Sequence, residues 1–558
     1  MSKEKVRYSE IIPKTKQWPI VQLSRDRKKF IEEVSAESFE SLKGITKGRS
    51  LREEVEMTIY REKARIRANP WRVDPRDEKP FWNKMQQRLL DSGAMEPAEA
   101  RKEEEKILME IIRRYAEEIS GNFKQNSYRF ARTVVTFGFA RLLNATRVKG
   151  LTSLFSRQLD LDDKIHIVGE TEHIRNLARH GTVVMVPTHF SNLDSILIGW
   201  VIQFLGLPPF IYGAGLNLFN IKIFAYFMNS LGAYKVDRRK KNPIYLETLK
   251  TYSSMALQRG CHSLFFPGGT RSRSGHIEKR LKLGLLSTTI EAQRILYQKA
   301  KDIKKAPKIF IVPVVINYNF TLEAPALINE HLKRTGQERY YQESDEFSSS
   351  YKISSFLFKF FTKGSDISVS IGKGMDILGN YVDDQGNSYD ANSHPIETVD
   401  YFISNGQITI DAQREEEYVR ILSRRIVEEY HKYNRVFASH LVAFTAFKML
   451  ERKNAKLDLY NLLRLPDEDL VLNYEEFKAV FKQLRKKVMK MEKAGKVSVA
   501  GHLKKKADQV IKLGVENVGL YHAQRPLIMK NGNIVIQNMN TLYYYHNRMD
   551  GYGLENYI

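Results

Sequence analysis

The stretch that decides the fold reads Val-Val-Met-Val-Pro-Thr-His-Phe-Ser-Asn-Leu-Asp and occupies residues 183–194. Its first four residues are continuously apolar, as expected of a strand buried on both faces, and Pro187 ends the run. His189 therefore follows the strand end directly. An apolar segment at 196–207 comes next, and its length suits a helix packed on a sheet. The pattern predicts a strand-to-helix turn that brings His189 and Asp194 together.

Two interpretations of this turn follow from its residues. In the first, the carboxylate of Asp194 fixes the tautomer of the His189 imidazole and stabilises its protonated form, as a general base requires. In the second, Ser191 and Asp194 have the spacing of a helix capping box, and Asp194 only accepts hydrogen bonds from backbone amides at the helix start. The spacing alone leaves both open.

Composition indicates a globular protein with a sizeable core. The chain has 558 residues, enough for two or three domains, and is 42% hydrophobic and 11% aromatic. A single cysteine, Cys261, excludes an internal disulfide framework and a multi-cysteine zinc site, which agrees with a reducing compartment. The first residues contain no apolar core of a signal peptide, so we expect a cytoplasmic location.

The formal net charge of +24 calls for an anionic partner: nucleic acid, an anionic membrane surface or a phosphorylated substrate. No charged residue occurs at 195–221, but Pro208-Pro209 interrupts this run well short of the roughly 20 residues of a membrane span. We therefore expect a core helix followed by a strand. Residues 128–148 interleave aromatic, aliphatic and arginine side chains, a pattern typical of a core helix or of a helix in a lipid headgroup layer.

Between about 160 and 380, short apolar strands alternate with helical segments, which is the signature of an α/β fold. We expect a mixed or parallel sheet flanked by helices, with helical N- and C-terminal regions. Strands are predicted at 165–168, 183–186, 210–212, 234–236, 263–266, 309–316 and 367–371. The predicted domains are a helical region at 1–160, an α/β domain at 161–400 and a mainly helical region at 401–558. In the last, Asn531-Gly532 predicts a hairpin.

Two basic motifs follow strands, where open α/β sheets place ligand sites. Residues 232–241 read Gly-Ala-Tyr-Lys-Val-Asp-Arg-Arg-Lys-Lys, whose last four cations suit an anion site or a solvated turn. Residues 265–275 read Phe-Phe-Pro-Gly-Gly-Thr-Arg-Ser-Arg-Ser-Gly. There a glycine pair lets backbone amides approach an oxyanion, and two guanidiniums suit bidentate phosphate contact. No Gly-Lys-Thr/Ser follows, so the pattern is not that of a nucleotide-cleaving P-loop.

Together with Ile-Val-Pro-Val-Val-Ile at 311–316, these segments resemble, in order and spacing, the four motifs of the glycerolipid acyltransferases. Three further segments resemble the large glycerol-3-phosphate and dihydroxyacetone-phosphate acyltransferases: residues 282–287, Tyr318-x4-Glu323, and the tyrosine-rich residues 542–547. The chain departs from the family at two positions. Gly268 stands where the family usually has glutamate, and Phe190 where the large subfamily usually has arginine or glutamine.

The resemblance implies transfer of a fatty acyl group from acyl-CoA or acyl carrier protein to glycerol 3-phosphate, without a covalent intermediate, a metal or a further cofactor. His189 would be the general base and Asp194 its orienting partner, with backbone amides near Gly268 and Gly269 at the tetrahedral oxyanion. Arg271 and Arg273 would hold the phosphate, with help from Arg238. Thr270, Lys282 and Pro313 complete the expected substrate-binding set.

Several alternatives remain at this stage. The acceptor could instead be 1-acylglycerol 3-phosphate (lysophosphatidate), which shares the phosphate. For either acceptor, the expected partners are the thioester donor, the glycerol phosphate acceptor and an anionic membrane surface, with the enzyme peripheral on the cytoplasmic face of the membrane.

Two alternatives belong to other classes of protein. A thiol hydrolase would use Cys261 with His262 or His189 as its base. A nucleic-acid-binding protein would use the lysine-rich residues 478–506, but they lack interleaved aromatics, so no nucleic acid is expected.

Overall fold

A seven-stranded sheet forms the centre of the computed structural model, which describes residues 8–45, 50–71, 73–130, 165–216, 232–336 and 366–558. The strand order is β1-β7-β6-β2-β5-β3-β4. The bounds are β1 Ile165–Gly169, β2 Gly181–Pro187, β3 Ile211–Gly215, β4 Ala233–Val236, β5 Ser263–Leu264, β6 Lys308–Tyr318 and β7 Ile367–Ile371. Strands β2 to β6 run parallel, whereas β7 pairs with β6 antiparallel and with β1 parallel. The predicted α/β fold with a mixed sheet is confirmed.

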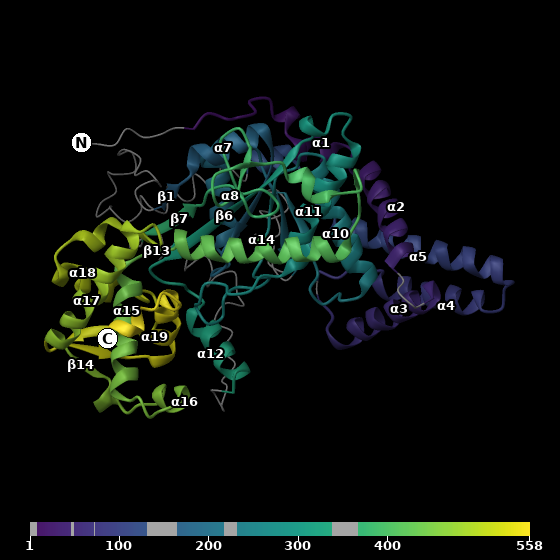
Figure 1. Ribbon diagram of the computed structural model, residues 1–558. Coiled ribbons are helices and arrows are strands. Elements are labelled where there is room, and N and C mark those ends of the chain that lie inside the picture. Colours follow the sequence, from purple (N-terminus) through teal and green to yellow (C-terminus); the bar gives the residue numbers. More distant parts are fainter. Residues whose placement is uncertain (1–7, 46–49, 72, 131–164, 217–231, 337–365) are drawn as a thin grey trace, which may run out of the picture.

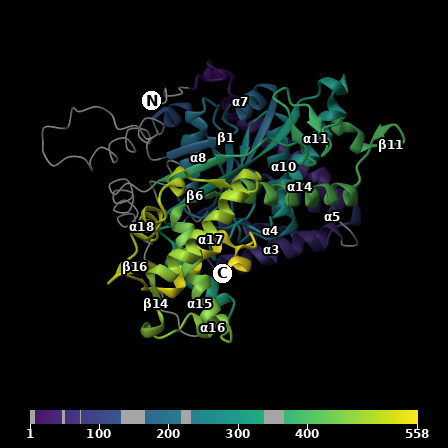
Figure 2. The same ribbon diagram turned by 60° about the vertical axis from the view of Figure 1, so that its left-hand side comes forward.

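Strand β2 lies inside the sheet and separates two apolar cores, because successive side chains of a strand point to opposite faces. Val183 and Met185 pack in the core that contains α8 (Asp194–Phe204). Val184 and Val186 pack on the other face, with α11 (Leu283–Lys299) and α14 (Ala412–Tyr433). Helix α14 lies beside α11 and crosses the sheet (Figure 1 and Figure 2). This burial on both faces explains why the strand reads as a continuous apolar run.

Helix α8 differs from the predicted 196–207 at both ends. It begins at Asp194 and ends at Phe204, because Gly206 adopts a left-handed conformation with φ of +66°. The amide of Gly206 donates to the carbonyl of Gln203 and that of Leu207 to Ile202, which closes the helix C-terminus. Strand β5 is also shorter than predicted, because after Leu264 the chain leaves the sheet toward His189. None of the helices in the described part of the chain combines the length and apolar character needed to cross a membrane.

The N-terminal region is a layer of helices packed on α10 (Pro243–Gln258). Its elements include α2 Arg27–Ile45, α3 Leu51–Ala68, α4 Glu78–Ser92 and α5 Pro97–Ile119. These helices extend to the right of the sheet in Figure 1. The core of the layer contains Trp82 and Tyr115, both buried, together with the apolar stripe of α5 that the sequence predicted as a helix. Most of the segment 128–148, discussed above as a core or interfacial helix, lies outside the described residues.

The C-terminal region packs around α15 (Ala438–Lys453), nearly all of whose first three turns are buried. The surrounding elements are α17 Tyr474–Lys493, α18 Ala507–Asn517 and α19 Met539–His546, with strands β14 Val471–Asn473, β16 Leu527–Lys530 and β17 Asn533–Ile536. The predicted hairpin is confirmed. Asn531 and Gly532 have φ of +50° and +74°, and β16 pairs antiparallel with β17 on either side of them.

Candidate active site

His189 lies just beyond β2, at the carboxyl edge of the parallel strands. Its ring stacks on the ring of Phe266, with the centroids 4.1 Å apart and the planes at 24°. Ring atom Nδ1 lies 2.8 Å from Oδ2 of Asp194. Because that carboxylate oxygen accepts, Nδ1 carries the proton and Nε2 keeps its lone pair. Nε2 makes no hydrogen bond within the described ranges, and His189 lines a cavity.

Asp194 is fully buried, and each of its carboxylate oxygens accepts hydrogen bonds. Besides His189, the amides of Phe190 and Ser191 donate to Oδ2 at 2.7 and 2.9 Å. The hydroxyl of Tyr318 donates to Oδ1 at 2.6 Å. The two interpretations of the turn therefore both describe this residue in part: Asp194 satisfies backbone amides of its own loop, and it also holds the imidazole. Hydrogen bonds from four donors hold this carboxylate in one orientation.

Tyr318, the last residue of β6, and Glu323, which follows the strand, connect the motifs of the site. Tyr318 is buried, and desolvation, followed by the charge of Asp194, raises the pKa of its hydroxyl so that it stays a donor. Glu323 accepts from the hydroxyl of Ser191 at 3.1 Å and from the amide of Asn192 at 2.9 Å. It also accepts from the guanidinium of Arg271 at 3.2 Å. The sequence showed the Tyr318-x4-Glu323 spacing only as part of a resemblance and suggested no role for either side chain.

A cavity of about 170 Å³ opens beside His189 at the carboxyl ends of β2, β3, β4 and β5. Its wall is mostly polar and carries three arginines: it consists of His189, Asn192, Ser195, Gly213, Ala214, Gly215, Arg238, Phe266, Thr270, Arg271, Arg273, Leu327 and Glu330. The structure thus brings the predicted base and the predicted phosphate-binding arginines to one space. Such a cavity suits a small anionic ligand placed against the imidazole.

The three arginines of the cavity differ in their partners. Arg271 contacts Glu323, while Arg273 lies 2.9 Å from a carboxylate oxygen of Glu330 and donates to Thr270 Oγ1 at 3.1 Å. Arg238 has no hydrogen bond or ion pair to any described residue. Desolvation, and then the like charges of Arg273 and Arg271, lower the pKa of Arg238. A dianionic phosphate at this point would relieve that repulsion.

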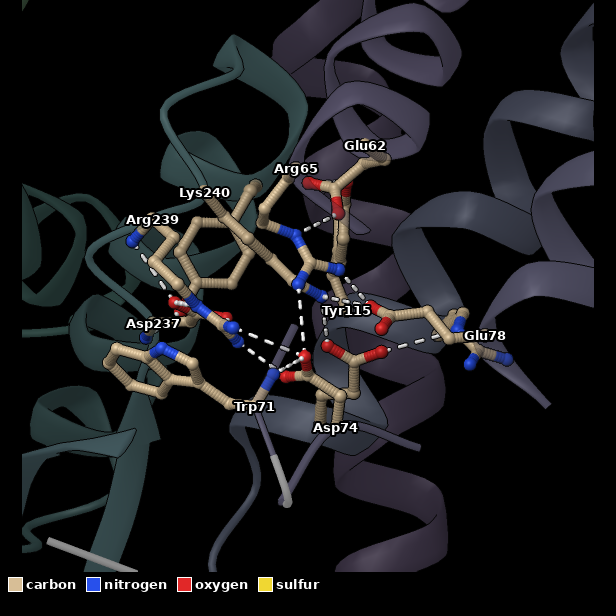
Figure 3. A network of polar contacts seen from close by, with 12 residues as sticks. Glu62, Arg65, Trp71, Asp74, Glu78, Tyr115, Asp237, Arg239 and Lys240 are labelled. Atoms are coloured by element: carbon tan, nitrogen blue, oxygen red, sulfur yellow. Dashed lines mark hydrogen bonds and ion pairs between the residues drawn. The ribbon is translucent and has the colours of Figure 1, made fainter. Parts of the chain in front are cut away.

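The neighbours of Arg238 in sequence, Arg239 and Lys240, take part in a network of polar contacts with the N-terminal region (Figure 3). Arg239 forms ion pairs with Asp237 and Asp74, and its guanidinium lies 4.0 Å from the ring centre of Trp71. Lys240 is buried and pairs with Glu118. Arg65, Glu62, Glu78 and Tyr115 continue the network beneath them. Of the four consecutive cations, only Arg238 lines the cavity among the described residues.

Comparison with known proteins agrees with this arrangement. Residues 168–317 match the sequence model of a family described as acyltransferase. This segment of the chain is thus similar to acyltransferases. Similar curated proteins are named glycerol-3-phosphate acyltransferase. The one from Aeromonas hydrophila is 27% identical over 47% of this chain and 29% of its own length. The one from Glaesserella parasuis is 30% identical over 41% of this chain and 24% of its own length. This chain therefore spans less than a third of the length of these relatives.

Not every residue selected by the resemblance to glycerolipid acyltransferases reaches the cavity. Thr270 does, but Gly269 has φ of +77° and its amide donates to the carbonyl of Phe266, so this amide closes a turn and does not face an oxyanion. Lys282 caps α11 at the surface, and its amide donates to Pro267. Pro313 is buried inside β6 opposite Val186. Neither Lys282 nor Pro313 lines the cavity.

The tyrosine-rich residues 542–547 lie against residues 265–275, the loop that carries Arg271 and Arg273 and is called the arginine loop below. Asn547 Nδ2 donates to the carbonyl of Ser274 at 2.7 Å. Gly275 has φ of +84°, and a Cβ there would lie 2.1 Å from the carbonyl oxygen of Tyr544, so only glycine fits. The guanidinium of Arg548 lies 3.9 Å from the ring centre of Phe190. The C-terminal region thus supports both the motif around His189 and the arginine loop.

The geometry of Cys261 does not support a thiol hydrolase. The side chain is buried, and desolvation raises the pKa of its thiol to about 12. Desolvation also lowers the pKa of the neighbouring His262 to about 4, and its Nδ1 accepts from the amide of Val183 at 3.0 Å. Cys261 precedes β5, whereas His189 follows β2, at the opposite edge of the sheet. A thiolate nucleophile is therefore disfavoured here.

No group of three or more His, Cys, Asp and Glu side chains is arranged as a metal site within the described ranges. The expectation that this protein uses no metal and no cofactor stays a prediction.

Proposed function

We propose that this protein is an O-acyltransferase that moves a fatty acyl group from a thioester, acyl-CoA or acyl carrier protein, to glycerol 3-phosphate in phospholipid synthesis. One observation carries the proposal: the cavity next to Nε2 of His189 is also lined by three guanidiniums, of which that of Arg238 has no partner among the described residues. A base and an anion site in one small space suit an acceptor that carries both a hydroxyl and a phosphate.

The reaction begins with proton removal from the acceptor hydroxyl by Nε2 of His189. Asp194 holds Nδ1 at 2.8 Å and stabilises the imidazolium that forms. The acceptor oxygen attacks the thioester carbonyl, and the C–S bond then breaks. The imidazolium returns its proton to the leaving thiolate, so the protein ends in its starting state. Holding both reactants beside the base supplies much of the acceleration.

The polar wall of the cavity favours glycerol 3-phosphate over lysophosphatidate as the acceptor. Asn192, Ser195 and Glu330 line it together with the arginines, and they offer hydrogen-bond partners to the free hydroxyls of a small acceptor. The phosphate is common to both molecules, so the arginines do not discriminate between them. The alternative keeps a basis in the sequence, because the Ser-Asn-Leu-Asp of residues 191–194 and the Val-Asp-Arg of 236–238 resemble enzymes that acylate lysophosphatidate.

The purified chain should be assayed with labelled acyl-CoA and acyl carrier protein donors and equal concentrations of the two acceptors. We expect labelled lysophosphatidate from glycerol 3-phosphate, and no product with the His189→Ala variant. Phosphatidate formed exclusively from lysophosphatidate would replace the proposed acceptor. Product from neither acceptor, with a folded chain, would refute the proposal for this protein.

We also propose that the enzyme acts as a peripheral protein on the cytoplasmic face of the membrane. The net charge of +24 and the lipid product support this, since an anionic surface offers about 1 kcal/mol per nearby lysine or arginine. High salt or carbonate should then release most of the protein from membranes. Retention in the pellet until detergent is added would contradict peripheral binding.

A further inference from the structure

Glu278 is a partly buried carboxylate behind His189 that the reaction described above does not use. Its Oε1 accepts a hydrogen bond from the backbone amide of His189 at 3.0 Å. Its Oε2 is buried and has no hydrogen-bond partner among the described residues. Desolvation raises the pKa of this carboxyl to about 7. A carboxyl held in such surroundings is costly, so its contact with His189 needs a reason.

The position of Glu278 depends on the absence of a side chain at residue 268. A Cβ added to Gly268 would lie 3.0 Å from both Cγ and Oε1 of Glu278. That distance is tighter than ordinary van der Waals contact, so a side chain at 268 and the carboxyl of Glu278 compete for one space. Gly268 has an ordinary backbone conformation and does not need to be glycine for its own φ. The glycine therefore makes room for Glu278.

The same loop holds both polar groups of the His189 peptide backbone. Glu278 binds the amide, and the amide of Ser272 donates to the carbonyl of His189 at 2.7 Å. On the side-chain end, Asp194 holds Nδ1 and Phe266 covers one face of the ring. The direction of Nε2 is thus set from both the backbone and the ring. Glu278 itself is absent from the described residues that line the cavity, so it acts through His189 and does not contact substrate.

We propose that Glu278 is a positioning residue for the general base, and that Gly268 is its required neighbour. The proposal rests on the proposed acyl transfer. The carboxyl fixes the His189 backbone by accepting its amide, so that Nε2 points at the acceptor hydroxyl. The function of Glu278 is to accept this hydrogen bond and does not depend on a negative charge. The side-chain amide of a glutamine at position 278 can therefore replace the carboxyl. This predicts that Glu278→Gln is tolerated and Glu278→Ala is not.

Steady-state kinetics should compare Glu278→Gln, Glu278→Ala and Gly268→Ala. We expect kcat to fall roughly 10- to 100-fold in Glu278→Ala, with the acceptor KM within about twofold, because a misplaced base slows the chemical step. Glu278→Gln should stay within about threefold of the natural chain. Gly268→Ala should resemble Glu278→Ala, because its Cβ displaces the carboxyl. The double variant with both alanine substitutions should have a kcat only slightly lower than that of either single variant.

Glu291 offers a matched control. It lies on α11, and desolvation raises its pKa to about 7 as well, but no hydrogen bond links it to His189 or its loop. Glu291→Ala should leave kcat within about twofold. Thermal melts should accompany all variants, so that a general loss of folding is recognised. Full activity in Glu278→Ala would overturn the proposal, and so would a Glu278→Gln variant as slow as Glu278→Ala.

Hydrogen exchange separates this proposal from the proposed function, because it needs no substrate. In Glu278→Ala, but not in Glu278→Gln or Glu291→Ala, we expect amide exchange in the peptide that contains His189 to rise about tenfold or more. Unchanged exchange would refute the positioning role whatever the protein acylates. Raised exchange in a protein that acylates neither acceptor would support the positioning role and refute the proposed function alone.

Discussion

Two adjacent arginines should give opposite results when each is replaced by alanine. Arg239 is almost fully buried and donates to Asp237 at 2.7 Å and to the carbonyl of Asn69 at 2.9 Å, besides its ion pair with Asp74. Arg239→Ala leaves two carboxylates facing each other without their shared cation. Breaking a buried ion pair from one side costs about 3–5 kcal/mol. Arg238 makes no such contact with a described residue, so Arg238→Ala should change stability by less than about 0.5 kcal/mol.

The effect on acceptor binding should be the reverse. A hydrogen bond from Arg238 to a phosphate is charge-assisted and contributes about 1.5–3 kcal/mol. At about 1.4 kcal/mol per tenfold, its loss should raise the acceptor KM roughly 10- to 150-fold. The KM of the thioester donor should change little. In Arg239→Ala we expect a smaller rise in acceptor KM, because the loop that carries Arg238 loosens but the arginine remains.

Denaturant unfolding followed by tryptophan fluorescence can measure the stability difference. Three of the four tryptophans, Trp18, Trp71 and Trp82, lie in the N-terminal region, and Trp71 contacts Arg239 directly. Acyl transfer at varied acceptor concentration supplies the KM values. The reasoning would be refuted if Arg238→Ala left the acceptor KM unchanged. It would also be refuted if Arg239→Ala raised that KM more than Arg238→Ala while the unfolding midpoint stayed constant.

Three further predictions concern His189, Asp194 and their surroundings. His189→Ala should lower kcat by about 10²–10⁴ in a folded protein, and Asp194→Asn should approach that loss although it keeps part of the loop hydrogen bonding; full turnover in either variant would contradict the roles proposed. Tyr318→Phe removes the donor to Oδ1 of Asp194, and we expect a roughly tenfold fall in kcat with donor and acceptor KM nearly unchanged. The pKa of the Glu278 carboxyl is raised from 4.5 to about 7 in the folded protein. The unfolded chain therefore releases this proton at lower pH, so the free energy of unfolding should fall as pH rises from about 4.5 to about 7. Because glutamine does not titrate, chemical denaturation should show Glu278→Gln gaining stability relative to the natural chain between pH 5 and pH 8.

The contact between His189 and Asp194 was predictable because its signal is local. His189 and Asp194 are five residues apart, and a buried strand followed by an apolar helix fixes the turn between them. The strands were predictable for the same reason, since each is a short apolar run between turn residues. The supporting residues were not, because Tyr318 reaches Asp194 across 124 positions of sequence. No periodicity or spacing within one element reports such a contact.

The loop at 265–275 shows a different limit. The sequence shows that a side chain is missing at Gly268, but it cannot show that the carboxyl of Glu278 fills the space, because the nine intervening residues must first fold back on themselves. Likewise it cannot show that the amide of Gly269 is used within its own turn. Glycine pairs permit close approach of a backbone amide to an oxyanion, but only the fold decides whether the amide faces the cavity.

The run of cations at 238–241 explains why the N-terminal region matters to the site. The sequence gives these side chains nearly equal chemistry, yet the structure separates them by partners that lie far away in the chain. Asp74 precedes Arg239 by 165 residues, and Glu118 precedes Lys240 by 122. Both carboxylates lie outside the segment 168–317 that matches the acyltransferase family. Because they neutralise two of the cations and draw them out of the cavity, Arg238 remains to meet an anionic substrate. The chemistry of the cavity therefore depends on an N-terminal region that carries none of its motifs.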